Sequence, residues 1–138
     1  MANLFLAEDN PADVFLVREA LAAHNIEIDL TVVPDGNAAM RAVEEICAED
    51  ECDRPGVVML DINLPLVDGF TVLAALRDHP NCALVPVIIV SSSDSARDRQ
   101  KAFSLGASHY FRKPPDLNGF LELGGLIGSF LRNPGAVL

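Results

Sequence analysis

The sequence predicts an α/β protein in which five parallel strands, each followed by a helix, form a doubly wound sheet. Three short apolar runs, at residues 4–7, 57–60 and 87–90, are bounded by polar or turn-forming residues. Such runs are typical of strands that are buried on both faces of a parallel sheet. The segments between them carry apolar residues at helical spacing, so strands and helices alternate along the chain.

Each element is predicted from its own residue pattern. We expect strands near residues 3–8, 28–33, 56–61, 86–91 and 107–112, with a helix after each. The second strand alternates apolar and polar residues, which predicts one wetter face and a place near the edge of the sheet. The faces of the first three helices are formed by Val14, Val17 and Leu21, by Ala39, Val43 and Ile46, and by Phe70, Leu73 and Leu76.

Length and charge restrict the class of protein. With 138 residues, half of them apolar, the chain can bury one core, so we expect one domain over residues 1–132 and a tail over residues 133–138. The formal charge of −10 and only ten scattered Lys and Arg residues argue against nucleic-acid binding, which needs clustered cations. No apolar stretch reaches the about 20 residues that span a bilayer, and no export signal is visible. We therefore expect a cytoplasmic protein without a membrane segment.

The three cysteines, Cys47, Cys52 and Cys82, are odd in number and lack a Cys-x-x-Cys pair. This pattern fits neither a disulfide framework nor a zinc site. We expect reduced thiols.

Polar side chains gather where the expected strands end. Glu8 and Asp9 follow the first strand, Asp61 ends the third, Ser91 follows the fourth and Lys113 follows the fifth. Because the carboxyl ends of parallel strands meet at one edge of a sheet, we expect these groups to share a cleft. Three carboxylates in one cleft repel one another unless a cation neutralises them, and Mg²⁺ prefers oxygen ligands of this kind. The pattern therefore predicts a Mg²⁺ site.

Asp61 by itself proves little, since an aspartate after a strand is more often a helix cap or a turn residue. Its combination with the acidic pair, the hydroxyl of Ser91 and the ammonium of Lys113 favours a chemical role. A carboxylate that attacks a phosphoryl group needs a metal to shield both charges and donors for the equatorial oxygens. Taken alone, Ser91 would be a surface capping residue and Tyr110 an ordinary edge-strand aromatic.

Five short motifs, in this order, resemble the receiver domains of bacterial response regulators, the CheY-like family. They are LAEDNP at residues 6–11, MLDINLP at 59–65, DG at 68–69, VSS at 90–92 and YFRKP at 110–114. The fold that we expect is a flavodoxin-like sheet with strand order 2-1-3-4-5 and helices on both faces. The resemblance implies a single-domain response regulator of a two-component system, which accepts a phosphoryl group from a histidine kinase and signals by changing its conformation.

The resemblance also implies the roles of the site residues. Asp61 would be the phosphoacceptor, and Lys113 would pair with the phosphoryl oxygens. Mg²⁺ would be held by Asp9, Asp61 and the backbone carbonyl of Asn63, while Glu8 would act through a bound water molecule.

Two further features of the family are expected here. The hydroxyl of Ser91 would move toward the phosphoryl group, and the ring of Tyr110 would turn inward behind it, so that these residues form the switch. The Lys113–Pro114 peptide bond resembles the family's cis bond, and Pro115 after it is less usual.

Partners are also implied by resemblance. The start of the first helix at residues 10–13, the long segment before the third strand, and the KPPDL sequence at residues 113–117 are similar to stand-alone receivers that serve phytochrome-type histidine kinases. The signal would pass to a downstream protein or along a phosphorelay.

The last helix, near residues 116–131, is apolar most of the way round. One face must pack on the sheet, and the other is available for a second copy of the chain. A homodimer through the fourth helix, fifth strand and fifth helix is one interpretation, and a tail that folds back over the same surface is the other.

Three other functions are alternatives for a chain with this arrangement of residues. An aspartate-nucleophile phosphatase needs a second acid two residues after the nucleophile, where this chain has Asn63. A flavin or nucleotide binder needs a phosphate loop after its first strand, where Glu8 and Asp9 would repel phosphate. A receiver that binds its partner without phosphorylation is the remaining alternative, and the intact acidic, hydroxyl and lysine set argues against it. We expect no enzyme beyond a phosphoacceptor that assists its own phosphotransfer and dephosphorylation.

Overall fold

The strands form one five-stranded parallel sheet in the order β2-β1-β3-β4-β5. The computed structural model describes residues 3–48 and 54–135. Its strands are β1 (Asn3–Ala7), β2 (Asp29–Val33), β3 (Val57–Asp61), β4 (Val87–Ser91) and β5 (His109–Arg112). The predicted strand order is confirmed, and each strand begins and ends within two residues of its predicted range.

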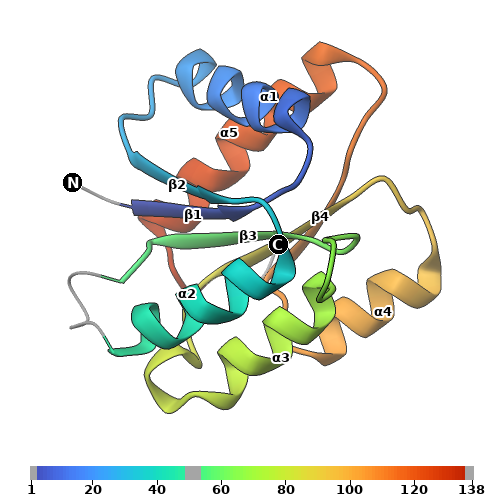
Figure 1. Cartoon of the computed structure of the whole chain (residues 1–138). Helices are drawn as coiled ribbons and strands as arrows, with labels where there is room; N and C mark the ends of the chain where they lie inside the picture. The colour runs from blue at the N-terminus through green and yellow to red at the C-terminus, as the bar shows by residue number, and fades with distance from the viewer. Residues whose placement is uncertain (1–2, 49–53, 136–138) are drawn as a thin grey trace.

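Helices cover both faces of the sheet (Figure 1). They are α1 (Pro11–Ala23), α2 (Gly36–Ala48), α3 (Gly69–Asp78), α4 (Ala96–Ser104) and α5 (Leu117–Arg132), with a 3₁₀ turn, η2 (Pro80–Cys82), before β4. Helices α1 and α5 lie on one face, and α2, α3 and α4 lie on the other. None of the helices in the described part of the chain is long and apolar enough to cross a membrane.

The central strands contribute to two cores because successive side chains point to opposite faces. In β1, Leu4 and Leu6 pack under α1 and α5, whereas Phe5 and Ala7 pack under the other three helices. Every residue of β3 and β4 is buried, which explains why these strands are continuous apolar runs in the sequence. The residues of β2 are exposed or half-buried, which confirms its predicted place at the edge.

Two of the cysteines lie side by side in the core beneath α2 and α3. Cys47 and Cys82 are free, and neither side chain is exposed. Their sulfur atoms are 2.6 Å apart, and the side-chain amide of Asn81 donates a hydrogen bond to the Cys47 carbonyl at 3.0 Å. Cys52 lies outside the described residues.

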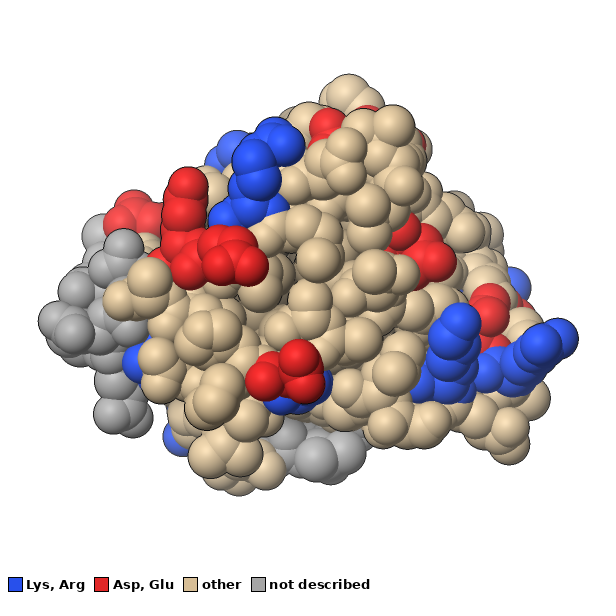
Figure 2. Space-filling model, turned by 60° about the horizontal axis from the view of Figure 1, so that its bottom comes forward, with Lys and Arg blue, Asp and Glu red and all other residues tan. Residues whose placement is uncertain are grey.

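Charged side chains on the face formed by α2, α3 and α4 occur in small separate groups (Figure 2). Lys and Arg lie among Asp and Glu around a largely uncharged centre. As far as its residues are described, this face has no continuous basic surface of the kind that holds a phosphate backbone.

Helix α5 packs against α1 as well as against the sheet. Its buried apolar residues are Phe120, Leu123, Ile127 and Phe130, and its half-buried ones are Leu121, Leu126 and Leu131. Gly124 lies where the two helices meet, because a Cβ at this position would collide with the carbonyl oxygen of Ala20 and the ring of His24. Part of the second face of α5, for which the sequence predicts a partner surface, is therefore covered by α1.

We expect Gly124→Ala to destabilise the protein even though alanine favours a helix by about 1 kcal/mol over glycine. The added methyl group has no room against the backbone of α1, and overpacking typically costs about 1–3 kcal/mol. Urea denaturation should show a lower free energy of unfolding. The matched control is Gly125→Ala, whose Cβ would meet only the ring of His24, at 3.3 Å. Equal stability of the two variants would contradict a close approach of the helices at Gly124.

Candidate functional site

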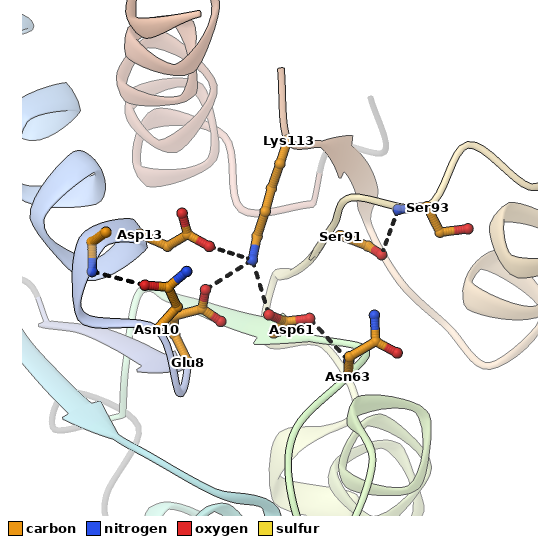
Figure 3. Close-up of polar contacts among 9 residues, drawn as sticks. Glu8, Asn10, Asp13, Asp61, Asn63, Ser91, Ser93 and Lys113 are labelled. Atoms are coloured by element: carbon orange, nitrogen blue, oxygen red, sulfur yellow. Dashed lines mark hydrogen bonds and ion pairs between the residues drawn. The ribbon is translucent and has the colours of Figure 1, made fainter. Parts of the chain in front are cut away.

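Residues from three strand ends meet around the side chain of Lys113 (Figure 3). Glu8 follows β1, Asp61 ends β3 and Lys113 follows β5. The Nζ atom of Lys113 donates to Glu8 Oε1 at 2.8 Å and to Asp61 Oδ2 at 2.9 Å. Glu8 is only 4% exposed and Asp61 only 6%. The structure thus brings together three of the residues that the sequence places in one cleft.

A further carboxylate contacts Lys113, and its place in this cluster was not predicted from the sequence. Asp13 Oδ2 lies 2.7 Å from Lys113 Nζ. Asp13 is in the first turn of α1, where Asn10 is the N-cap and Pro11 is the first helical residue. Acidic residues are common in this turn because they stabilise a helix N-terminus, so the pattern indicated a helix start rather than a site. Spacing alone carried no signal that Asp13 reaches the lysine.

Asp9 completes a group of carboxylates that could hold a metal ion. Ligand oxygens of Glu8, Asp9 and Asp61 all lie within 4.8 Å of one another, with Asp9 the exposed member. The backbone N–H of Asn63 donates to Asp61 Oδ1 at 2.9 Å, which fixes the carboxylate on the side away from Lys113. The role of the Asn63 carbonyl as a ligand stays a prediction.

The surroundings of Glu8 and Asp61 shift the pKa values of these two residues in opposite directions. Burial, followed by the neighbouring carboxylates of Asp61 and Asp13, raises the pKa of Glu8 to about 9. Burial also opposes ionisation of Asp61, but the neighbouring Glu8 carboxyl, the Asn63 N–H and the Lys113 ammonium outweigh burial and lower the pKa of Asp61. Near neutral pH, Glu8 therefore carries a proton while Asp61 is an anion.

Lys113 remains charged in this environment. Burial disfavours its ammonium, but hydrogen bonds with Asp13, Glu8 and Asp61 outweigh burial and hold the pKa of Lys113 above its ordinary value. The cluster thus contains one fixed cation among several carboxylates, and the proton on Glu8 relieves part of their repulsion.

The donor set fits a hard divalent cation. Glu8 Oε2 is buried and has no hydrogen-bond partner among the described residues. A buried oxygen of this kind is normally satisfied by a donor, a water molecule or an ion. Oxygen ligands from carboxylates, supplemented by water, are what Mg²⁺ and Mn²⁺ prefer. A cation here would also replace the screening that the Glu8 proton provides.

The two proposed switch residues are joined through the loop between β4 and α4. The hydroxyl of Ser91 accepts a hydrogen bond from the Ser93 N–H at 3.0 Å, and the Tyr110 hydroxyl donates to the Ser93 carbonyl at 3.0 Å. The Ser93 hydroxyl donates to Asp98 of α4 at 2.7 Å. Both residues are buried, and the ring of Tyr110 is directed inward beneath Arg99. Ser93 therefore connects them to α4.

The expected cis bond between Lys113 and Pro114 is wrong, because the described residues contain no cis peptide bond. The trans form of a bond before proline is favoured by about 0.5–1 kcal/mol. Lys113 is aimed without a cis turn, since its backbone N–H continues the sheet by donating to the Ser91 carbonyl at 2.7 Å. From there its long side chain reaches the carboxylates.

A family model described as a response regulator receiver domain matches residues 4–123. The chain is 32% identical over 127 residues to response regulator Rcp1 of Synechocystis sp., covering 92% of this chain and 86% of the relative.

Solved structures of high similarity have the same fold. The phosphorylated cyanobacterial phytochrome response regulator RcpA is 32% identical, with a TM-score of 0.82 over 96% of this chain and 94% of that one. The Mn²⁺-bound form of Rcp1 is 29% identical, with a TM-score of 0.83 and 96% of each chain covered.

The raised pKa of Glu8 predicts how stability depends on pH when metal is removed. The folded protein retains a proton on Glu8 that the unfolded chain releases above pH 4.5. The contribution of Glu8 to the free energy of unfolding is therefore complete below pH 4.5 and is lost as the pH rises toward 9. Glu8→Gln, which cannot ionise, should flatten this part of the pH profile. Urea denaturation with a chelator at several pH values measures it.

The matched control for this pH profile is Glu19→Gln, which removes an exposed carboxylate from α1. This variant should keep the wild-type slope. An unchanged slope in Glu8→Gln would contradict the assignment of the proton to Glu8.

Proposed function

Because the chain belongs to the response regulator receiver domain family, we propose that residues 1–132 form a receiver that accepts a phosphoryl group on Asp61 from a sensor histidine kinase. The observation that carries this proposal is the setting of Asp61. It is a buried anion at the end of β3, held by the Asn63 N–H and by Lys113, beside Glu8 and Asp9. In this proposal the protein is a signalling module, and the side chain whose phosphorylation it assists is its own Asp61.

The chemistry needs an ionised carboxylate that faces a phosphoryl group. One Asp61 oxygen forms a bond to phosphorus while the bond from phosphorus to the donor, a histidine nitrogen in the kinase, breaks. The lowered pKa means that no proton must be removed from Asp61 first. The ammonium of Lys113 then pairs with phosphoryl oxygens as their charge develops.

We infer that the metal is Mg²⁺, held by Asp9, Asp61 and the Asn63 carbonyl, with Glu8 acting through water. The bound ion would supply the positive charge that lets a carboxylate and a phosphoryl group approach. The carboxylate group, the unpartnered Glu8 oxygen and the Mn²⁺-bound relative support this assignment.

The output is a conformational change of the loop between β4 and α4. In this proposal the Ser91 hydroxyl, which accepts a hydrogen bond from the Ser93 N–H, turns from it to donate to a phosphoryl oxygen. Tyr110 and Asp98 are bonded to the same Ser93, so movement of this residue would reach β5 and α4 together. These contacts support Ser91 and Tyr110 as the switch.

We propose a phytochrome-type histidine kinase as the donor, since the relative RcpA is described as a cyanobacterial phytochrome response regulator. A downstream protein or phosphotransfer partner would receive the signal. A homodimer through α4, β5 and α5 is proposed as well, because Phe103 of α4 and Leu117 of α5 expose 39% and 53% of their surface. Nucleic acid and membrane have no part in this function.

Incubation with acetyl phosphate and Mg²⁺ should add the mass of one phosphoryl group to the wild-type protein. Asp61→Asn, which preserves size but removes the nucleophilic carboxylate, should gain none. Intact mass spectrometry measures both. If the wild type stays unmodified at high Mg²⁺, or the variant is modified equally, Asp61 is not the phosphoacceptor.

The hydroxyl of Ser91 is expected to affect the response to phosphorylation and not phosphorylation itself. Ser91→Ala should still be phosphorylated on Asp61, because the hydroxyl does not form the bond to phosphorus. It should lose the change in hydrogen exchange that phosphorylation causes at residues 92–98, because no hydroxyl leaves Ser93 for the phosphoryl group. A phosphorylation-dependent change as large as that of the wild type would contradict the switch role of Ser91.

A further inference from the structure

The three N–H donors of the Lys113 ammonium all face acidic side chains. Its Nζ lies 2.8 Å from Glu8, 2.7 Å from Asp13 and 2.9 Å from Asp61 (Figure 3). An ammonium has three donors and no acceptor, so these contacts leave none free. The shortest contact is the one to Asp13.

Asp13 differs from the other two carboxylates because the metal-binding group does not include it. Among the described residues, that group consists of Glu8, Asp9 and Asp61. Asp13 is fixed by α1, where its N–H donates to the Asn10 carbonyl at 3.0 Å. Its side chain is 19% exposed, so water screens the ion pair less than it would on the open surface. Asp13 therefore gives Lys113 a fixed contact from a carboxylate that is not needed as a metal ligand.

We propose that Asp13 is a positioning residue that holds Lys113 beside Asp61 during phosphoryl transfer. This inference rests on the proposed function of Asp61. Once Asp61 carries a phosphoryl group, its carboxylate is no longer an anion and becomes a weaker acceptor. The Lys113 N–H that contacts Asp61 then turns to a phosphoryl oxygen. The contacts with Asp13 and Glu8 meanwhile keep the ammonium in place.

Asp13→Asn removes the charge of this contact and keeps the size of the side chain. We expect the rate constant for phosphorylation by acetyl phosphate to fall roughly 3- to 10-fold, as when one charge-assisted hydrogen bond in a reacting complex is weakened. Asp13→Glu, which keeps the charge, should recover part of the rate. The matched control is Glu19→Gln, an exposed carboxylate on the same helix, which should react at the wild-type rate.

A double-mutant cycle distinguishes positioning from a general structural role. In a Lys113→Ala background, Asp13→Asn should cause no further loss of rate, because its effect acts through the lysine. A loss of equal size in both backgrounds would overturn the proposal, as would a wild-type rate in Asp13→Asn alone. If the wild type itself is not phosphorylated, the proposed function fails and this inference fails with it.

A second inference concerns Cys47 and Cys82, which lie at the end of the sheet where the strands begin. The two thiols belong to the last turn of α2 and to η2, and Asn81 ties these segments together. Their sulfur atoms lie 2.6 Å apart, which is close to the about 2.05 Å of an S–S bond. Neither thiol contributes to the site around Asp61.

We infer that this pair is a modification site, a dithiol that a peroxide converts to a disulfide. One thiolate attacks a peroxide oxygen to give a sulfenic acid and water, and the second sulfur displaces a second water as the S–S bond forms. Two thiols thus supply two electrons and two protons to one hydrogen peroxide. Burial raises the pKa of Cys47 to about 12, so the reaction should be slow and should depend on local opening of η2.

The Cys52→Ser variant tests this inference, because it leaves only the two buried thiols. After treatment with hydrogen peroxide, denaturation and alkylation, peptide mass spectrometry should find Cys47 linked to Cys82 within one chain. The linkage should disappear on reduction. Recovery of both cysteines as alkylated thiols, or as separate sulfinic acids, would overturn the inference whatever the outcome at Asp61.

Discussion

The ammonium of Lys113 holds together the parts of the chain that make the site. It contacts carboxylates that follow β1, begin α1 and end β3. Carboxylates this close would otherwise repel one another and favour protonation. One ammonium does not balance the group, and burial together with the neighbouring carboxylates keeps a proton on Glu8. The remaining deficit of positive charge is the physical reason to expect a divalent cation beside Asp61.

The register of the parallel sheet decides which groups can meet. Asp61 pairs with Val90 of β4, and Ser91 pairs with Arg112 of β5. Lys113 comes next along the chain and donates its N–H to the Ser91 carbonyl, so it leaves the sheet at the same edge as Asp61. The same strand end also carries the loop through which Ser93 reaches α4. One edge of the sheet therefore supplies both the reacting group and the route by which a change there leaves the site.

Most of the fold could be predicted from the sequence because its signals are local. Continuous apolar runs indicate strands that are buried on both faces, and Glu8, Asp61 and Lys113 could be placed at one edge because parallel strands end there. Asp13 could not be predicted, since its contact with Lys113 spans 100 residues and its position already had an ordinary capping explanation. The close approach of α1 and α5 at Gly124 could not be predicted for a similar reason, because it depends on how the two helices cross.

The role of Asp61 is tested most directly by a crystal structure of the protein with Mg²⁺ and beryllofluoride, which mimics a phosphoryl group on an aspartate. We expect beryllofluoride on Asp61, with Lys113 contacting a fluorine while it keeps its contact with Asp13, and with the Ser91 hydroxyl turned away from Ser93. This expectation would be contradicted by beryllofluoride bound elsewhere. It would also be contradicted by beryllofluoride on Asp61 with Lys113 contacting neither a fluorine nor Asp13.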